Sequence, residues 1–429
     1  MGSERARAAT ILRWVLPRSL LVLLGTAAGL GCAEIILRAR PDFVPVAVQV
    51  DPPVRRARPL RDETYDVKLS DGDIYFWRRS AFRPIRARDD RPLARVHMRT
   101  DADGFRNPPG DDGSYPIVVL GDSFTEAGNA TVPWPEHLAR IAGRGVLNLG
   151  ESGAGPQHAL RNLESYGLER NPEEIILAWF EGNDLLDAGA WERVNPFLVA
   201  RLGRHLLGGA RRALFGGHDE GGIDGGGRPP IFPLAVSAGE RKLEMAFWPG
   251  HIALLTVSRG DLASSVNVSL SRDAIRRMHA ISVAAGARLR IVYLPCRSRI
   301  YLPLLDAPSL ARLLEGIEPL SLDTGGFLAP RAGAAGRRDP DRIPGLIRGL
   351  DAQALIIEEI AREEGIPFLD LTARFQLEAK EGAELHYPFD THWNQNGHLL
   401  AAEVIAAALE ASTDGRQRQD RRSPAVTSR

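Results

Sequence analysis

The feature that most constrains the fold is a series of five short apolar runs separated by helical patterns. Each run is four to seven residues long, and together they comprise Ile117–Leu120, Val146–Leu149, Glu174–Phe180, Arg288–Leu294 and Ile366–Leu371. Apolar residues recur at helical spacing between and after these runs, over Pro135–Ala142, Pro156–Glu169, Ser271–Ala285, Asp351–Glu364 and Asn396–Ala411. Buried strands that alternate with helices predict a three-layer α/β/α architecture, with one parallel five-stranded sheet covered on both faces.

Two long segments interrupt this alternation, at about 187–270 and 296–348. Both start beyond the end of a predicted strand, where open parallel sheets bind ligands, so they are candidate substrate-binding elements, with plain linkers as the alternative. The first contains a glycine-rich stretch at 216–230, and the second is expected to be irregular, with a mobile part near Ala329–Pro340. We divide the chain into an N-terminal segment (1–40), an irregular lead-in (41–115), the α/β domain (116–411) and a disordered tail (412–429).

The N-terminal segment contains an apolar run over residues 20–37 that follows four arginines. At about 1.5 Å per residue, such a helix nearly spans a hydrocarbon core of about 30 Å. The positive-inside rule keeps residues 1–18 cytoplasmic. We therefore expect an uncleaved single-pass anchor in the inner membrane, with the α/β domain in the periplasm. Further arginines just after the run oppose this orientation, and a cleaved signal peptide or a buried helix of the domain are the alternatives.

The overall charge argues against a nucleic-acid-binding protein, and the cysteines argue against a disulfide-stabilised protein. The chain has 54 basic and 54 acidic residues, so it has no general electrostatic attraction to nucleic acid. Its two cysteines, Cys32 and Cys296, lie far apart in apolar surroundings, which does not suggest a disulfide framework.

Four short polar segments follow the predicted strands. They are Gly121-Asp122-Ser123, Asn148 to Gly155, Gly182-Asn183-Asp184, and Asp390-Thr391-His392-Trp393-Asn394. Each has a common structural explanation when taken alone: a helix cap, a tight glycine turn, an Asn-Asp turn, or a structural Asp–His contact.

Together the four segments supply the parts of a nucleophilic serine site. A serine hydroxyl such as that of Ser123 needs a base, and a base such as His392 needs a partner such as Asp390 to hold its tautomer. The anion that forms on an attacked carbonyl needs donors, which the Asn183 amide offers. Ser123 lacks a flanking Gly-x-Ser-x-Gly motif, which argues against the nucleophile elbow of α/β-hydrolases.

These segments resemble blocks I, II, III and V of the SGNH (GDSL-type) hydrolase family, from residue 117 to about 410. The resemblance implies a flavodoxin-like α/β/α fold that needs no cofactor or metal. It implies that Ser123 is the nucleophile, with its backbone N–H as an oxyanion donor. Gly153 would contribute a second backbone N–H and Asn183 a side-chain amide. His392 would be the base and Asp390 its carboxylate.

The sequence departs from the family pattern at two places. Glu181 stands where block III usually has glycine, and only Thr391 separates Asp390 from His392, where two residues are usual. The Asp-x-His-Trp spacing is similar to that of O-acetyltransferases and esterases that act on bacterial exopolysaccharides. In alginate acetylation proteins that motif precedes the serine, whereas here it follows. The segment Thr100–Arg106 also resembles one found before block I in membrane-anchored members.

We therefore expect a serine esterase or acyl (acetyl) transferase that acts on short acyl esters of an extracytoplasmic glycan such as an envelope polysaccharide, without a nucleic-acid partner. One alternative is a metal-dependent phosphoesterase with His386, Asp390, His392 and His398 as ligands. Another is a non-catalytic, membrane-tethered protein of the same fold that binds a glycan or assembles an envelope complex.

Overall fold

A parallel sheet of five strands forms the centre of the larger of two compact units in this chain. The computed structural model describes residues 2–40, 64–69, 94–107, 115–192, 199, 202, 234–330, 342–388 and 390–420. The smaller unit comprises Met1–Pro59 and Val194–Asp219, and the larger comprises Leu60–Arg193 and Glu220–Arg429.

The sheet has the strand order β11-β8-β5-β3-β4, and every neighbouring pair is parallel. Its strands are β3 (Ile117–Gly121), β4 (Val146–Gly150), β5 (Glu174–Phe180), β8 (Arg288–Leu294) and β11 (Phe368–Asp370). All five predicted strands are present, and the α/β fold with a parallel five-stranded sheet is confirmed. In chain order the strands lie as 2-1-3-4-5, the flavodoxin-like order. The order reverses between β3 and β5, where such sheets open a crevice at their carboxyl ends.

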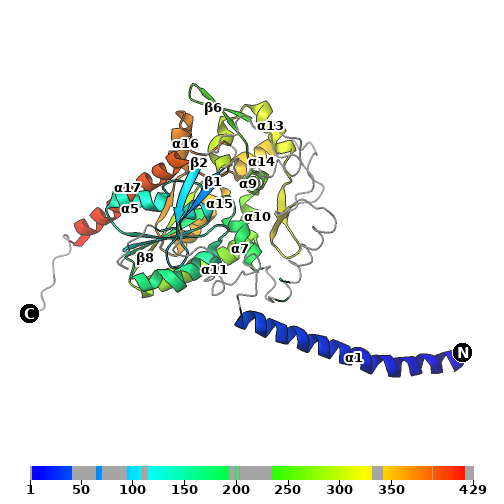
Figure 1. Ribbon diagram of the computed structural model, residues 1–429. Coiled ribbons are helices and arrows are strands. Elements are labelled where there is room, and N and C mark those ends of the chain that lie inside the picture. The colour runs from blue at the N-terminus through cyan, green and yellow to red at the C-terminus, as the bar shows by residue number, and fades with distance from the viewer. Residues whose placement is uncertain are drawn as a thin grey trace, which may run out of the picture. The chain divides into compact units, whose positions relative to one another are not determined.

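Helices cover both faces of the sheet because successive side chains of each strand point to opposite sides. In β3, Ile117 and Val119 join one hydrophobic cluster, and Val118 and Leu120 join the other. The first face is covered by α5 (Trp134–Ala142), α16 (Thr372–Lys380) and α17 (Gln395–Asp420) (Figure 1). The second face is covered by α6 (Pro156–Asn162), α11 (Val266–Ala284) and α15 (Ala352–Glu363). This is the predicted three-layer arrangement.

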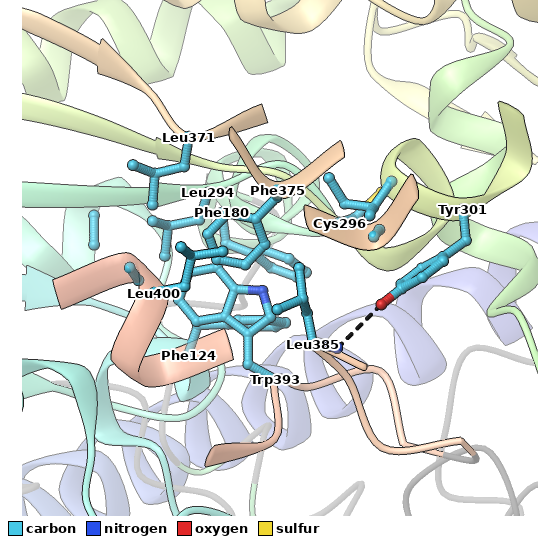
Figure 2. Close-up of a cluster of buried hydrophobic side chains, with 14 of the residues drawn as sticks. Phe124, Phe180, Leu294, Cys296, Tyr301, Leu371, Phe375, Leu385, Trp393 and Leu400 are labelled. Carbon is cyan, nitrogen blue, oxygen red and sulfur yellow. Dashed lines mark hydrogen bonds between the residues drawn. The ribbon is translucent and has the colours of Figure 1, made fainter. Parts of the chain in front are cut away.

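Figure 2 shows part of the hydrophobic cluster on the first face, which includes Phe124 and Trp393, the neighbours of Ser123 and His392 in the chain. Trp393 is fully buried there, with the rings of Phe124 and Phe375 packed against it at centroid distances of 5.2 and 4.9 Å. Nearby, the Tyr301 hydroxyl accepts a hydrogen bond of 3.1 Å from the Leu385 backbone N–H. Trp393, which follows His392 in the chain, is therefore fixed in the core.

The two segments predicted as insertions contain regular structure. Within 187–270 lie the β6–β7 hairpin (Leu234–Ala238 and Arg241–Met245), α9 (Pro249–Leu255) and α10 (Arg259–Ser264). The expectation that 296–348 is irregular was wrong, because it forms α12 (Arg297–Tyr301), η5 (Leu302–Leu304), α13 (Ala307–Glu315), the β9–β10 pair (Leu320–Leu322 and Leu328–Pro330) and α14 (Arg342–Gly349). These elements are too short for hydrophobic periodicity to reveal them. The glycine-rich stretch 216–230 and most of the part expected to be mobile, 331–340, lie outside the described residues.

Several predicted boundaries also differ from the structure. The helix expected over Pro156–Glu169 ends its α-helical part at Asn162 and continues as π-helix η3 (Leu163–Gly167) and 3₁₀-helix η4 (Leu168–Arg170). Helix α17 runs to Asp420, so the boundary predicted at 412 was wrong: no proline interrupts the chain before Pro424. The remaining short elements are α4 (Ser123–Glu126), α7 (Asp184–Glu192) and the antiparallel pair β1 (Thr64–Leu69) and β2 (Ala94–Arg99).

In the smaller unit, the described part is dominated by α1 (Gly2–Ala39), which contains the predicted anchor at 20–37. Glu34 forms an ion pair of 2.8 Å with Arg38 and accepts a hydrogen bond of 2.9 Å from the Val199 backbone N–H. Among the residues that the structure describes, no helix is long and apolar enough to cross a membrane.

Candidate active site

Ser123 lies at the exit of β3, as the first residue of α4, and its neighbour Asp122 caps that helix. The Asp122 carboxylate accepts a hydrogen bond of 2.9 Å from the Phe124 backbone N–H, and the Ser123 hydroxyl lies 3.5 Å from its other oxygen. Burial raises the pKa of Asp122 to about 6, although the Phe124 N–H and the charge of His392 oppose the shift. The cap therefore fixes where the serine hydroxyl emerges.

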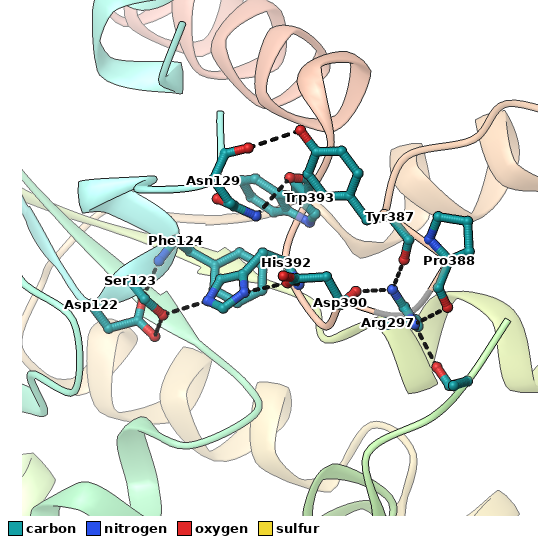
Figure 3. A network of polar contacts seen from close by, with 11 residues as sticks. Asp122, Ser123, Phe124, Asn129, Arg297, Tyr387, Pro388, Asp390, His392 and Trp393 are labelled. Atoms are coloured by element: carbon teal, nitrogen blue, oxygen red, sulfur yellow. Dashed lines mark hydrogen bonds and ion pairs between the residues drawn. The ribbon is translucent and has the colours of Figure 1, made fainter. Parts of the chain in front are cut away.

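The three side chains expected to share the chemistry form a continuous hydrogen-bond chain (Figure 3). His392 Nε2 lies 2.8 Å from Ser123 Oγ, and His392 Nδ1 lies 2.6 Å from Asp390 Oδ1. Asp390 is acceptor-only when ionised, so it accepts a hydrogen bond from His392 Nδ1–H, which leaves the Nε2 lone pair facing the serine. This tautomer is the one that can accept a proton from Ser123.

Asp390 remains ionised although it is almost fully buried. Burial alone would raise its pKa, but the charge of His392 and two hydrogen bonds from that residue, together with Arg297, hold the pKa of Asp390 below its ordinary value. One of those bonds comes from the His392 backbone N–H, at 2.9 Å. The His392 ring packs on Phe124, with centroids 4.9 Å apart, and its side chain is 20% exposed, so substrate can reach it.

Gly153, expected as an oxyanion donor, lies in the loop after β4. Its φ of +74° is in the left-handed region, which favours glycine. A Cβ at this position would meet no atom within 4 Å, so the backbone conformation and not steric crowding is the reason for glycine here. The loop is held on one side by the Ser152 backbone N–H, which donates to Glu126 of α4 at 2.8 Å. On the other side, a Cβ on Gly155 would lie 2.9 Å from Asp187 Cβ of α7.

Asn183 follows β5 and immediately precedes α7. Its side-chain amide nitrogen donates to Asp187 Oδ2 at 2.8 Å. Burial and the charge of Asp122 raise the pKa of Asp187 to about 7. Asn183 and Gly153 thus stand at the exits of the two strands that flank β3, although no hydrogen bond links either residue to Ser123 within the described part of the chain.

Glu181, which departs from the family pattern, lies in a buried polar cluster. Its carboxylate accepts hydrogen bonds from the Tyr293 hydroxyl at 2.9 Å and the Cys296 backbone N–H at 3.0 Å. It also forms an ion pair of 3.1 Å with Arg299. The side chains of Glu181 and Arg299 are 1% and 4% exposed, which marks this pair as structural.

The segment that precedes the first strand of the sheet also acquires a physical role. Arg106 is buried, and its guanidinium donates to the Ala130 carbonyl at 2.6 Å and to the Ala127 carbonyl, both just after α4. Asn107 exchanges two side-chain hydrogen bonds with the backbone of Asn148, at 2.8 and 3.1 Å, along the edge strand β4. This segment therefore braces the turn that follows Ser123.

Three residues near the site were not predicted from the sequence: Asp187, Arg297 and His251. Arg297 follows the exit of β8, and its position after a predicted strand was an available signal. His251 lies on α9, with its ring 5.5 Å from that of Phe180. Burial, followed by the charges of His392 and Arg297, lowers the pKa of His251 to about 3, so its imidazole is neutral.

The metal-ligand alternative gains no support from the arrangement of its residues. His386 and His398 are buried, with their rings edge-on to Tyr301 and Trp393 respectively, each at 5.6 Å. Among the described residues, no group of three or more His, Cys, Asp or Glu side chains could hold a metal ion.

Comparison with known families gives one match. Residues 340–428 match the model described as SGNH hydrolase-like domain, acetyltransferase AlgX. The matched segment includes Asp390 and His392 and ends beyond α17. In this segment the chain is similar to SGNH hydrolase-like acetyltransferases of the AlgX type, and the match confirms the resemblance to SGNH-type esterases and acyltransferases drawn from the sequence. No curated protein matches the sequence.

Among solved structures, the chain resembles a lipase/acylhydrolase from Enterococcus faecalis (12% identity, 70% of this chain and 96% of that one, TM-score 0.33). It also resembles a GDSL-like lipase from Bacteroides thetaiotaomicron (10% identity, 71% and 92%, TM-score 0.33). A third is a catalytic mutant of Axe2, an acetylxylan esterase from Geobacillus stearothermophilus (12% identity, 67% and 91%, TM-score 0.33). TM-scores of this size do not establish a shared fold, so the fold assignment rests on the sheet described above.

Proposed function

We propose that this protein is a serine-dependent esterase or acyltransferase that works through an acyl-enzyme on Ser123. The observation that carries the proposal is the unbroken chain from Ser123 Oγ to His392 Nε2, at 2.8 Å, and from His392 Nδ1 to Asp390 Oδ1, at 2.6 Å. Both distances are within hydrogen-bonding range for a base and its orienting carboxylate. The family match over residues 340–428 supports the same chemistry.

In the first step, His392 Nε2 takes the proton of the Ser123 hydroxyl while the oxygen attacks the acyl carbonyl carbon. Asp390 stabilises the imidazolium that forms and remains ionised itself. The carbonyl double bond opens to an oxyanion, and the imidazolium then gives its proton to the departing alcohol oxygen as the ester C–O bond breaks. General-base help of this kind contributes about 10²–10⁴ in rate.

The oxyanion is stabilised by the backbone N–H groups of Ser123 and Gly153 and by the amide of Asn183. Asp187 accepts one N–H of that amide at 2.8 Å, which orients the other for the oxyanion. The left-handed turn at Gly153 and the tight contact of Gly155 with Asp187 hold the loop beside α7. Preorganised donors of this type contribute about 10²–10³ each.

The acyl-enzyme is resolved when His392 removes a proton from a second hydroxyl, either of water or of a sugar. The oxygen of that hydroxyl attacks the acyl carbon, and Ser123 leaves with the proton. We favour a short acyl group, such as acetyl, on an extracytoplasmic glycan. The support is the AlgX acetyltransferase match together with the Asp-x-His-Trp spacing.

The test uses the detergent-purified full chain and a fluorophosphonate probe, which labels activated serines covalently. Labelling of the wild type that is lost in Ser123→Ala and reduced in His392→Ala supports the proposal. If the probe labels neither the wild type nor Ser123→Ala, the non-catalytic glycan-binding alternative replaces it. A chain-length series of nitrophenyl esters, with and without acetyl-accepting oligosaccharides, then separates hydrolysis from transfer. Equal activity on long-chain esters would contradict the short-acyl assignment.

The location of the enzyme is a separate part of the proposal. The apolar run at 20–37, preceded by arginines, supports an inner-membrane anchor with the α/β domain in the periplasm. Bacteria that express the full chain should retain it in the membrane fraction after an alkaline carbonate wash. Protease added to spheroplasts should then degrade the α/β domain. Release by the wash, or protection from the protease, would contradict this part.

A further inference from the structure

Arg297 is a buried cation whose guanidinium contacts the backbone of the segment that carries Asp390 and His392 (Figure 3). It lies in the first turn of α12, just beyond the exit of β8, and is 1% exposed. Its Nη1 donates to the carbonyls of Pro388, at 3.0 Å, and Ala246, and its Nη2 donates to those of Tyr387 and Asp390.

The segment held in this way has little regular structure of its own. Between α16 and α17, the described residues contain one isolated bridge, between His386 and Trp393, and no helix or longer strand. Its conformation therefore depends on contacts with the rest of the fold. A displacement of about 1 Å in a reacting group can cost about 10²-fold in rate. The contacts that fix the position of this segment should therefore affect the catalytic rate.

The guanidinium suits this task for geometric reasons. Its planar fork presents five N–H donors, so it can bind carbonyls that converge from different directions. Three of the four carbonyls belong to the segment with Asp390, and the fourth, of Ala246, follows the β6–β7 hairpin. The Ala246 backbone N–H also donates to the Pro388 carbonyl at 3.0 Å. Arg297 therefore joins the hairpin region to the segment that carries the base.

The charge of Arg297 acts in the same direction as its geometry. It is one of the groups that hold the pKa of Asp390 below its ordinary value, against the opposing effect of burial. Burial is the main cause of the lowered pKa values of His251 and His386, and the charge of Arg297 adds to it. One cation therefore favours an ionised Asp390 and neutral imidazoles around it.

We propose that Arg297 is a positioning residue of the active site, which holds Asp390 and His392 in register with Ser123. This inference rests on the function proposed above. Arg297 acts through backbone carbonyls and through charge, so its loss is expected to lower kcat with little change in KM.

Arg299 provides a matched control in the same short helix. It is also buried, but its guanidinium pairs with Glu181 at 3.1 Å and with Asp351 at 2.6 Å, away from the catalytic segment. Arg297→Ala and Arg299→Ala therefore both remove a buried cation, and only the first releases the segment. Arg297→Lys keeps the charge but loses the fork.

Ester hydrolysis by the full chain is measured across pH for each variant and expressed per folded molecule. Arg297→Ala should lose about 10²-fold or more in kcat, and the acid limb of its kcat/KM profile should move to higher pH. Added ethylguanidinium should restore part of the activity. Arg297→Lys should lose kcat while the acid limb stays in place. Arg299→Ala should keep the wild-type profile.

A second readout requires no turnover. The His392 Nδ1 proton shared with Asp390 should give a downfield proton NMR signal that is lost in His392→Gln and in Arg297→Ala but kept in Arg299→Ala. Equal kcat and an intact downfield signal in Arg297→Ala would overturn the positioning role. If the wild type shows no Ser123-dependent activity, the proposed function fails, and the NMR comparison still decides whether Arg297 positions the pair.

Discussion

Replacing Glu181 with alanine should destabilise the folded protein strongly and leave the chemistry at Ser123 intact. The carboxylate is 1% exposed and pairs with Arg299, which is 4% exposed, at 3.1 Å. Its removal leaves the Arg299 cation buried, with Asp351, whose side chain is 72% exposed, as a remaining partner. Tyr293 O–H and Cys296 N–H lose the same acceptor.

The expected size of the loss follows from this burial. Removing one partner of a buried ion pair costs about 3–5 kcal/mol because the other charge remains buried and uncompensated. Native domains are stable by about 5–15 kcal/mol in total, so the variant should lose about a fifth or more of its stability. Glu181→Gln keeps the volume and part of the hydrogen bonding and should lie between the wild type and Glu181→Ala.

Urea unfolding followed by tryptophan fluorescence measures the free energy of unfolding, and fluorophosphonate labelling below the transition measures the active site. Asp351→Asn is the control, because it removes the exposed partner of Arg299 and should change stability little. A labelling rate more than about tenfold lower in fully folded Glu181→Ala would give Glu181 a part in the chemistry. Unchanged stability would refute the structural role assigned to the pair.

Three further changes test other parts of the site. Asn183→Ala should lower kcat by about 10²–10³, because one oxyanion donor is lost, and an undiminished kcat would remove Asn183 from that role. Asp390→Asn should lower kcat by about 10⁴ in ester hydrolysis, because the new amide holds the wrong His392 tautomer. Asp187→Asn tests pH dependence: the raised pKa of Asp187, about 7, means that its stabilising effect is complete below the ordinary value near 4 and is lost as pH rises to about 7. When the free energy of unfolding is measured from pH 4 to 8, it should fall less with rising pH in Asp187→Asn than in the wild type. Identical pH dependence in the two proteins would contradict this account.

Much of the fold was accessible from the sequence because strand burial leaves a local trace. A strand covered on both faces is apolar along most of its length, and β5 and β8 begin and end at the predicted residues, Glu174–Phe180 and Arg288–Leu294. The insertions were less accessible because α9, α10, α12, α13 and α14 have only five to nine residues each. One or two turns do not give a reliable apolar period.

By itself, the sequence determined the α/β class, the parallel sheet and the residues that follow its strands. Those residues converge because parallel strands all present their carboxyl ends at one edge, so Ser123 and Asn183 needed no long-range information to be singled out. Only the tertiary structure decided which polar groups contact one another there. Glu181 pairs with Arg299, Asp187 holds the Asn183 amide, and Arg297 reaches carbonyls about 90 positions further along the chain. Such contacts join side chains to backbone atoms that every residue carries, so no pattern of residue types marks the partner in advance.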